Sequence, residues 1–100
     1  MAELQIRVPY TAWGEGEEWE TGYLELMGDL STAVKDGGLG TDGDADHFDD
    51  HICFYLIGEN VGELRIAARE VLMRHDLRGV ATGYVTNPDA EDGQATPVAL

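Results

Sequence analysis

The chain has 100 residues, of which 43% are hydrophobic, and its 20 acidic residues outnumber six basic ones, for a net charge of −14. This length suits one domain with one core, and the hydrophobic content argues against global disorder. A chain this acidic repels nucleic acid and anionic membranes, and we therefore expect it to bind neither directly. It attracts cations and basic proteins. The excess is uneven, because residues 1–50 carry a net charge of −11 and residues 51–100 a net charge of −3.

Targeting signals and disulfides are not expected. The longest strongly apolar run, Ile52–Ile57, is far too short to cross a bilayer. The first residues lack the basic and apolar regions of a signal peptide. Cys53 is the single cysteine, which excludes an internal disulfide framework. We therefore expect a cytoplasmic protein.

A strand and a long helix are predicted first along the chain. Apolar and polar residues alternate from Leu4 to Tyr10, which is the period of a half-buried strand. Pro9 cannot donate a hydrogen bond to a neighbouring strand, so this strand either lies at an edge or ends near that residue. Apolar side chains at three- and four-residue spacing then predict a helix over residues 16–36, which Gly37–Gly38 ends.

Two glycines lie inside this predicted helix. Gly22 and Gly28 each cost about 1 kcal/mol relative to alanine in a helix interior. A break near Gly28 or a short strand at residues 23–27 therefore stays open as an alternative. The helix start is crowded with acidic residues, where the helix dipole favours anions: Glu15, Glu17, Glu18 and Glu20.

The second half predicts two further strands and a second helix. Residues 39–41 suit a short strand, and the continuously apolar run at residues 51–57 suits a central strand with both faces mostly covered. Asn60 begins an N-cap for a helix over residues 61–76. Residues 80–86 form the last predicted strand.

The resulting order, βαββαβ, is that of a ferredoxin-like α+β domain. We expect residues 1–87 to form a four-stranded antiparallel sheet with two helices on one face. Residues 88–100 are expected to be an acidic, flexible tail, with docking of residues 98–100 as the alternative. The order of elements between residues 16 and 58 also resembles small bacterial immunity-type and accessory proteins. Since ferredoxin-like domains host many unrelated functions, the fold alone assigns none.

A glycine motif at residues 38–43 matches G-x-G-x-x-G. Phosphate binding by this motif needs a strand before it and a helix after it. Here a predicted helix precedes it and an acidic turn follows, so we interpret it as a helix stop and a turn.

The acidic turn also invites a metal hypothesis. The spacing of the first three calcium-loop ligands is matched by Asp42, Asp44 and Asp46. His47 stands where that loop needs glycine and Cys53 where it needs glutamate, so an EF-hand is excluded. His47 and His51 share a face if this stretch is helical, but a zinc or nickel site needs a third convergent ligand. They stay weak metal candidates, and no cofactor is expected.

No catalytic constellation stands out. His51 points to the same strand face as Cys53, yet the apolar neighbours of Cys53 favour a buried, inert thiol. His75 on the inner side of the second helix is more typical of a packed histidine than of a base. With acids this frequent, chance carboxylate pairs carry no weight. We therefore expect a protein without enzymatic activity.

Surface charge is the remaining candidate for function. We predict an acidic binding or inhibitor protein that engages a basic protein surface, for example an immunity protein against a cationic toxin or a nucleic-acid mimic. Trp13 is a candidate anchor if it is exposed. The residues assigned to partner binding are Trp13, Glu15, Glu17, Glu18, Glu20, Asp42, Asp44, Asp46, Asp49 and Asp50.

Three alternatives stay open. The acidic surface can serve solubility alone. The chain can form a small-molecule-binding or enzymatic ferredoxin-like homodimer whose sheets pack together, with a pocket between sheet and helices near Tyr55, Tyr84 and His75. It can also hold a divalent metal through the acidic loop.

Overall fold

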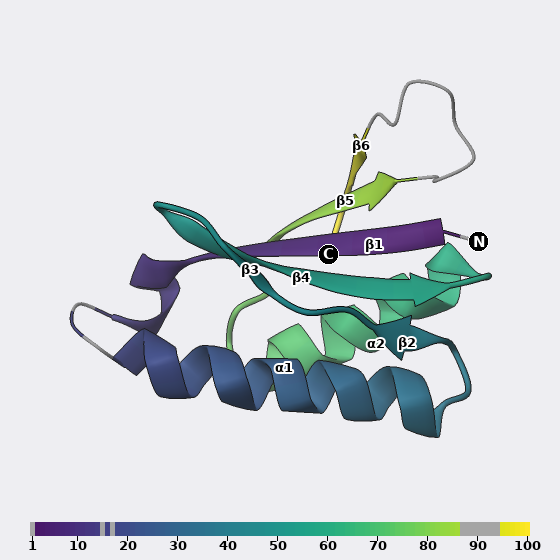
Figure 1. The fold of residues 1–100 in the computed structure, drawn as a ribbon, viewed down its shortest axis with the longest axis horizontal. Helices are drawn as coiled ribbons and strands as arrows, with labels where there is room; N and C mark the ends of the chain where they lie inside the picture. The colour runs from purple at the N-terminus through teal and green to yellow at the C-terminus, as the bar shows by residue number, and fades with distance from the viewer. Residues whose placement is uncertain (1, 15, 17, 87–94) are drawn as a thin grey trace.

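A computed structural model describes residues 2–14, 16, 18–86 and 95–100 of the chain. Alternating with helices, its strands build one sheet (Figure 1). The elements in chain order are β1 (Ala2–Pro9), the 3-10 helix η1 (Tyr10–Trp13), α1 (Glu18–Asp36), β2 (Thr41–Asp42), β3 (Asp46–His47), β4 (His51–Gly58), α2 (Val61–Arg74), β5 (Thr82–Thr86) and β6 (Ala95–Val98).

The sheet has the strand order β2-β4-β1-β5-β6, and β3 also pairs with β4. All these neighbours are antiparallel. The predicted ferredoxin-like arrangement is therefore confirmed, in a sheet with more strands than expected. β1 lies at the centre of the sheet and ends at Pro9, so the edge-strand alternative is wrong and the strand-end alternative is right.

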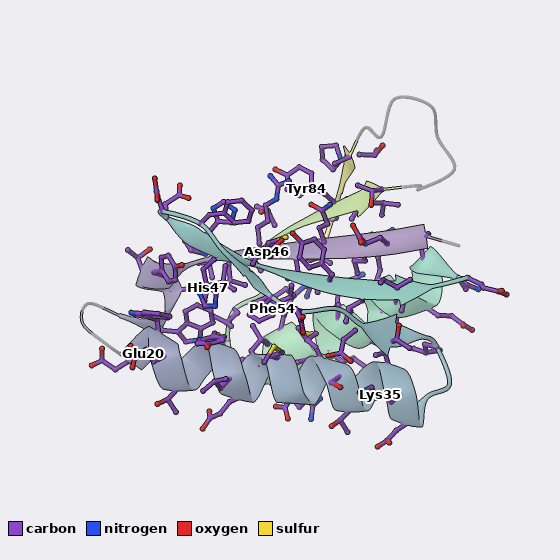
Figure 2. The ribbon with its side chains drawn as sticks, viewed as in Figure 1. Glu20, Lys35, Asp46, His47, Phe54 and Tyr84 are labelled. Carbon is purple, nitrogen blue, oxygen red and sulfur yellow. The ribbon has the colours of Figure 1, made fainter. Side chains whose placement is uncertain are left out.

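The core lies between one face of the sheet and the two helices. Leu4, Ile6 and Val8 of β1 are opposite Leu56, Phe54 and Ile52 of β4, and all six are buried. Alternation along both strands sends these side chains toward the helices, where Figure 2 shows Phe54. Burying each such large apolar side chain stabilises the fold by about 1.5–3 kcal/mol. The helices contribute Leu26, Leu30, Val34, Leu64, Ala68, Val71 and Leu72.

The opposite face of the sheet has no described helix over it (Figure 1). Cys53, Tyr55 and Ile57 of β4 point to this side, and Tyr55 and Ile57 are only half-buried. The expectation that β4 has both faces mostly covered is therefore wrong for one face. On this face Cys53 is buried although no described helix covers it.

Helix α1 is continuous across both of its glycines, so neither a break at Gly28 nor a strand at residues 23–27 occurs. The two glycines differ in their surroundings. A Cβ placed on Gly22 would collide with the indole ring of Trp13, whereas one on Gly28 would meet nothing within 4 Å. Gly22 therefore lets η1 pack closely against the helix, and Gly28 has no such role.

Part of the segment assigned to the tail is a strand. β6 pairs with β5 along its length, from Ala95 opposite Thr86 to Val98 opposite Gly83. Beyond it, the Arg65 guanidinium donates to the carbonyl oxygen of Ala99 at 2.9 and 3.2 Å. The docking alternative therefore holds for residues 98–100, while residues 88–94 of the predicted tail lie outside the described residues. Among the described helices, none is long and apolar enough to span a membrane.

Candidate functional site: an acidic and aromatic end

Four rings from three elements meet beside the start of α1. Trp19 packs edge-on against Tyr10 of η1, with ring centroids 5.0 Å apart, and stacks with Tyr23 one turn along the helix at 5.8 Å. The imidazole of His47 packs edge-on against Tyr23 at 5.0 Å and against Trp19 at 6.1 Å. His47 reaches them because it is opposite the buried Ile52 and therefore points to the helical side of the sheet, as Figure 2 shows.

The turn between β3 and β4 is fastened to these rings. The Tyr10 hydroxyl donates to the carbonyl oxygen of Phe48 at 2.9 Å, and the Tyr10 amide donates to the carbonyl oxygen of Asp50 at 3.2 Å. Phe48 stacks on His51 at 4.7 Å and stays 48% exposed. An open groove lies between η1 and the start of α1. It is lined by Tyr10, Thr11, Gly14, Gly16 and Trp19.

Exposed carboxylates surround these rings. Glu18 and Glu20 stand in the first turn of α1, and Asp49 and Asp50 form the tip of the β3–β4 turn, all four exposed. Figure 1 places both segments at the same end of the molecule. Burial and the charges of Asp49 and Asp50 raise the pKa of Tyr10, so the field of these acids reaches the rings. We name this region the acidic aromatic end: Tyr10, Trp19, Tyr23, His47, Phe48, Glu18, Glu20, Asp49 and Asp50.

The other aspartates of the predicted acidic loop lie elsewhere. Asp42 is opposite Leu56 on the helical side, where Ser31 donates to it at 3.0 Å and Lys35 lies 3.4 Å away. Burial alone would raise the pKa of Asp42, but the hydrogen bonds from Ser31 and Lys35 outweigh it and lower that pKa. Asp44 lines a groove beside the same part of α1.

Asp46 points to the open face of the sheet (Figure 2). It is opposite Cys53 and accepts a hydrogen bond from the Tyr55 hydroxyl at 2.6 Å. Burial and this hydrogen bond raise the pKa of Tyr55. The structure therefore divides the acidic loop among three places and brings only its tip, Asp49 and Asp50, to the start of α1.

Trp13 is half-buried and packs against the core and Gly22. This placement fits a structural side chain more than the exposed anchor considered from the sequence. Glu15 and Glu17, the other two acids predicted beside it, lie outside the described residues.

The two histidines proposed as weak metal candidates point apart. His47 is on the helical side of the hairpin, while His51 is opposite Pro9 on the other side. They lie on two different strands, β3 and β4, with a turn at residues 48–50 between them, so their four-residue spacing does not put them on one face. In the described parts of the chain, no group of three or more His, Cys, Asp or Glu side chains is placed to hold a metal ion.

The glycine motif serves the helix stop and the turn. Gly38 follows α1 with a φ of +66°, and its amide donates to the carbonyl oxygen of Lys35 at 3.1 Å. Gly40 approaches the carbonyl of Ile57 so closely that a Cβ there would collide with it. A phosphate-binding loop requires a helix directly after the motif, whereas here the short strand β2 overlaps it.

The structure does not bring together Tyr55, Tyr84 and His75, the residues expected around a pocket between sheet and helices. Both tyrosines lie opposite Gln5, on the open face of the sheet, and not between sheet and helices. His75 caps the end of α2, and its Nε2 lies 2.6 Å from the Asp29 carboxylate of α1. The sequence-based location was wrong because the register of β4 and β5 with β1 turns both tyrosines away from the helices.

Neither His–Asp pair of the described chain forms a catalytic arrangement with a nucleophile. His51 Nδ1 lies 2.6 Å from the Asp50 carboxylate, and this contact lowers the pKa of Asp50. The described hydrogen bonds connect neither this pair nor His75–Asp29 to a Ser, Thr or Cys side chain. Burial raises the pKa of Cys53, which disfavours the reactive thiolate.

Sequence reasoning missed four residues of this site: Tyr10, Trp19, Tyr23 and Phe48. Tyr10 was assigned to a strand, and Trp19 and Tyr23 to the core stripe of α1. A usable signal was the four-residue spacing of Trp19 and Tyr23, which stacks two rings on one helix face. The pairing of that face with the β3–β4 turn depends on long-range topology and left no local signal.

No protein-family model, curated protein or solved structure matches this chain.

Proposed function

We propose that the protein is a non-enzymatic binding protein whose acidic aromatic end engages a basic surface or segment of another protein. The observation that carries this proposal is the meeting of two exposed acidic segments around one ring cluster. Glu18 and Glu20 start α1, and Asp49 and Asp50 tip the β3–β4 turn, with Trp19 and Tyr10 between these segments. The protein is expected to act in the cytoplasm.

Both components of this end favour the same ligand chemistry. Carboxylates attract lysine and arginine side chains over a distance, which speeds association and makes it dependent on salt. Aromatic faces bind the same cations at short range, and arginine stacks on them best. A partner that presents arginines therefore gains from both components, whereas an acidic surface kept only for solubility needs no rings.

The rings are held in place before any partner arrives. The hydroxyl and amide of Tyr10 are both bound to the β3–β4 turn, and Trp19 is packed between Tyr10 and Tyr23. A preorganised site loses little conformational entropy on binding. An immunity protein against a cationic toxin and a mimic of a nucleic acid are two versions of this function, because both partners present a basic surface.

The test measures binding of a synthetic peptide of alternating arginine and glycine by calorimetry. Neutralising Glu18→Gln, Glu20→Gln, Asp49→Asn and Asp50→Asn together should weaken binding at least tenfold at low salt, since four attractive charges are lost. The matched control removes four acids elsewhere, through Asp36→Asn, Asp44→Asn, Glu59→Gln and Glu63→Gln.

The control changes net charge by the same amount, so it separates a site from a general attraction. We expect it to weaken binding less than threefold. Equal losses in the two variants would support solubility as the role of the acids. An affinity for the peptide that does not change between low and high salt would contradict the electrostatic account.

A further inference from the structure

The open face of the sheet carries an ordered array of side chains on its three central strands. Each row has one residue from β4, β1 and β5, in register across the sheet. The middle row is Tyr55, Gln5 and Tyr84; the row toward the acidic aromatic end is Cys53, Arg7 and Thr82; and the far row is Ile57, Glu3 and Thr86. Figure 2 shows Tyr84 on this side of the sheet.

We infer that this face is the interface of a homodimer, in which two copies stack their sheets face to face with their β1 strands antiparallel. A half-turn about an axis along the middle row exchanges the outer two rows. Arg7 of one copy then lies opposite Glu3 of the other, Cys53 opposite Ile57, and Thr82 opposite Thr86. In each outer row, a charged residue therefore meets one of opposite charge, an apolar residue meets an apolar one, and a hydroxyl group meets a hydroxyl group.

The charges select this arrangement over the other two-fold stacking. A half-turn about the axis of β1 itself would place Arg7 on Arg7 and Glu3 on Glu3. Like charges directly opposed destabilise an interface, and a self-complementary patch is what a two-fold dimer requires. Antiparallel stacking also puts the two acidic aromatic ends at opposite ends of the dimer, which keeps their charges apart and leaves both accessible.

The polar groups of the face are already joined to one another, which lowers the cost of burying them. Gln5 Nε2 and the Thr86 hydroxyl both donate to Glu3 Oε1, at 3.2 and 3.0 Å. Arg7 Nη2 donates to Gln5 Oε1 at 3.3 Å, and its guanidinium lies 4.0 Å from the centroid of the Tyr84 ring. A buried polar group is costly mainly when it has no partner, and these have partners before association.

The geometry of packed sheets agrees with these contacts. Two sheets stack about 10 Å apart with strand directions within about 30° of each other. Long side chains such as Arg7 and Glu3 span that gap from both sides. The N–H groups of Arg7 that do not bind Gln5 can bind Glu3 Oε2 of the other copy. Glu3, Gln5, Arg7, Tyr55 and Tyr84 are all half-buried in a single copy.

The test is a charge swap followed by sedimentation equilibrium. The unaltered protein should dimerise, and Glu3→Arg and Arg7→Glu should each raise the dimer dissociation constant at least tenfold, because each creates like-charge pairs. An equimolar mixture of the two single variants should form a heterodimer, and the double variant E3R/R7E should recover the dimer within threefold of the original. Glu70→Arg and Arg74→Glu on α2 are matched controls and should change the constant less than twofold.

Two results would overturn the inference. One is an unaltered protein that stays monomeric at concentrations up to about 1 mM, which corresponds to about −4 kcal/mol of association. The other is a dimer that neither single swap weakens, which would place the interface elsewhere. Neither result bears on peptide binding by the acidic aromatic end.

A thiol crosslink answers the same question if the swapped variants fail to fold. Residue 5 lies on the proposed two-fold axis, so Gln5→Cys in a Cys53→Ala background should be joined to its counterpart by a short bis-maleimide. Glu70→Cys in the same background is the control and should stay unlinked. Equal linking of both variants, or of neither, would count against the interface.

Discussion

The two ends of helix α1 present acidic side chains in opposite ways. Near the C-terminal end of α1, Ser31 and Lys35 hold Asp42, whose side chain is only 20% exposed. At its start, Asp50 is 89% exposed in a turn that Tyr10 binds. Glu20 and Lys35, which Figure 2 labels, are separated by about 22 Å along the helix axis at about 1.5 Å per residue. Acids of one sequence segment therefore serve the fold at one end and remain available to a partner at the other.

The largest expected effect concerns the rings at the start of α1. Trp19→Ala should lower the free energy of unfolding by about 3 kcal/mol, because it removes the packing of Tyr10, Tyr23 and His47 around the indole. Leu24→Ala, at a site that is 53% exposed on the same helix, should cost less than about 0.5 kcal/mol. Urea unfolding measures both, and equal losses would show that the rings do not organise this end.

The next prediction separates the two glycines of α1. Gly22→Ala should destabilise the protein by about 1–3 kcal/mol, since its methyl group would collide with the Trp13 indole. Gly28→Ala should stabilise it by up to about 1 kcal/mol, since the space there is open and alanine favours the helix. Thermal unfolding of the two variants provides the comparison. If both were stabilised, the close contact between η1 and α1 would be refuted.

The ion pair at the end of α1 should have a smaller, pH-dependent effect. The pKa of Asp42 is lowered in the fold, so its ionised form stabilises the protein above its ordinary pKa of 3.8, and this stability is lost as pH falls through the folded value. Asp42→Asn should therefore cost about 1 kcal/mol at pH 7. Lys35 is 60% exposed, so water screens its share and Ser31 supplies most of the effect.

The measurement is urea unfolding of both proteins as a function of pH. The difference between them should close as pH falls through the folded pKa of Asp42, which lies below its ordinary value of 3.8. A difference that persists below that pKa would mean that packing of the side chain, rather than its charge, stabilises this end.

The smallest effect tests the field at the acidic aromatic end. Burial and the charges of Asp49 and Asp50 raise the pKa of Tyr10, so Asp49→Asn combined with Asp50→Asn should lower it. Absorbance titration of tyrosine ionisation, with Tyr10→Phe identifying the signal, measures this shift. Asp42→Asn, at the other end of α1, should leave the Tyr10 titration unchanged. An equal shift from both changes would indicate a general effect of net charge.

Local patterns predicted most of the fold. The alternation in β1, the stripe of α1 and the Asn60 cap of α2 each depend on residues close in sequence, and the Asn60 side chain does accept from the Glu63 amide at 3.2 Å. β6 was missed because it has only four residues and Pro97 interrupts them, and its pairing with β5 supplies the order.

The candidate site was predictable only in part. Its acids were visible as clusters, but their separation depends on strand alternation in a hairpin that was interpreted as a turn. Asp46 and His47 are adjacent, yet they point to opposite sides of the sheet because β3 pairs with β4. The open face of the sheet was not predicted either, because the apolar run of β4 indicated that both of its faces were covered.

The most direct test of the central claim is to map where a basic peptide binds. Amide chemical shifts of the labelled protein would be followed by NMR as the arginine and glycine peptide is added. We expect the largest changes at Tyr10, in the first turn of α1 and at residues 47–51, with little change at Lys35 and Asp42. Changes of equal size at both ends of α1, or larger changes near Lys35, would contradict the claim that the acidic aromatic end is the binding site.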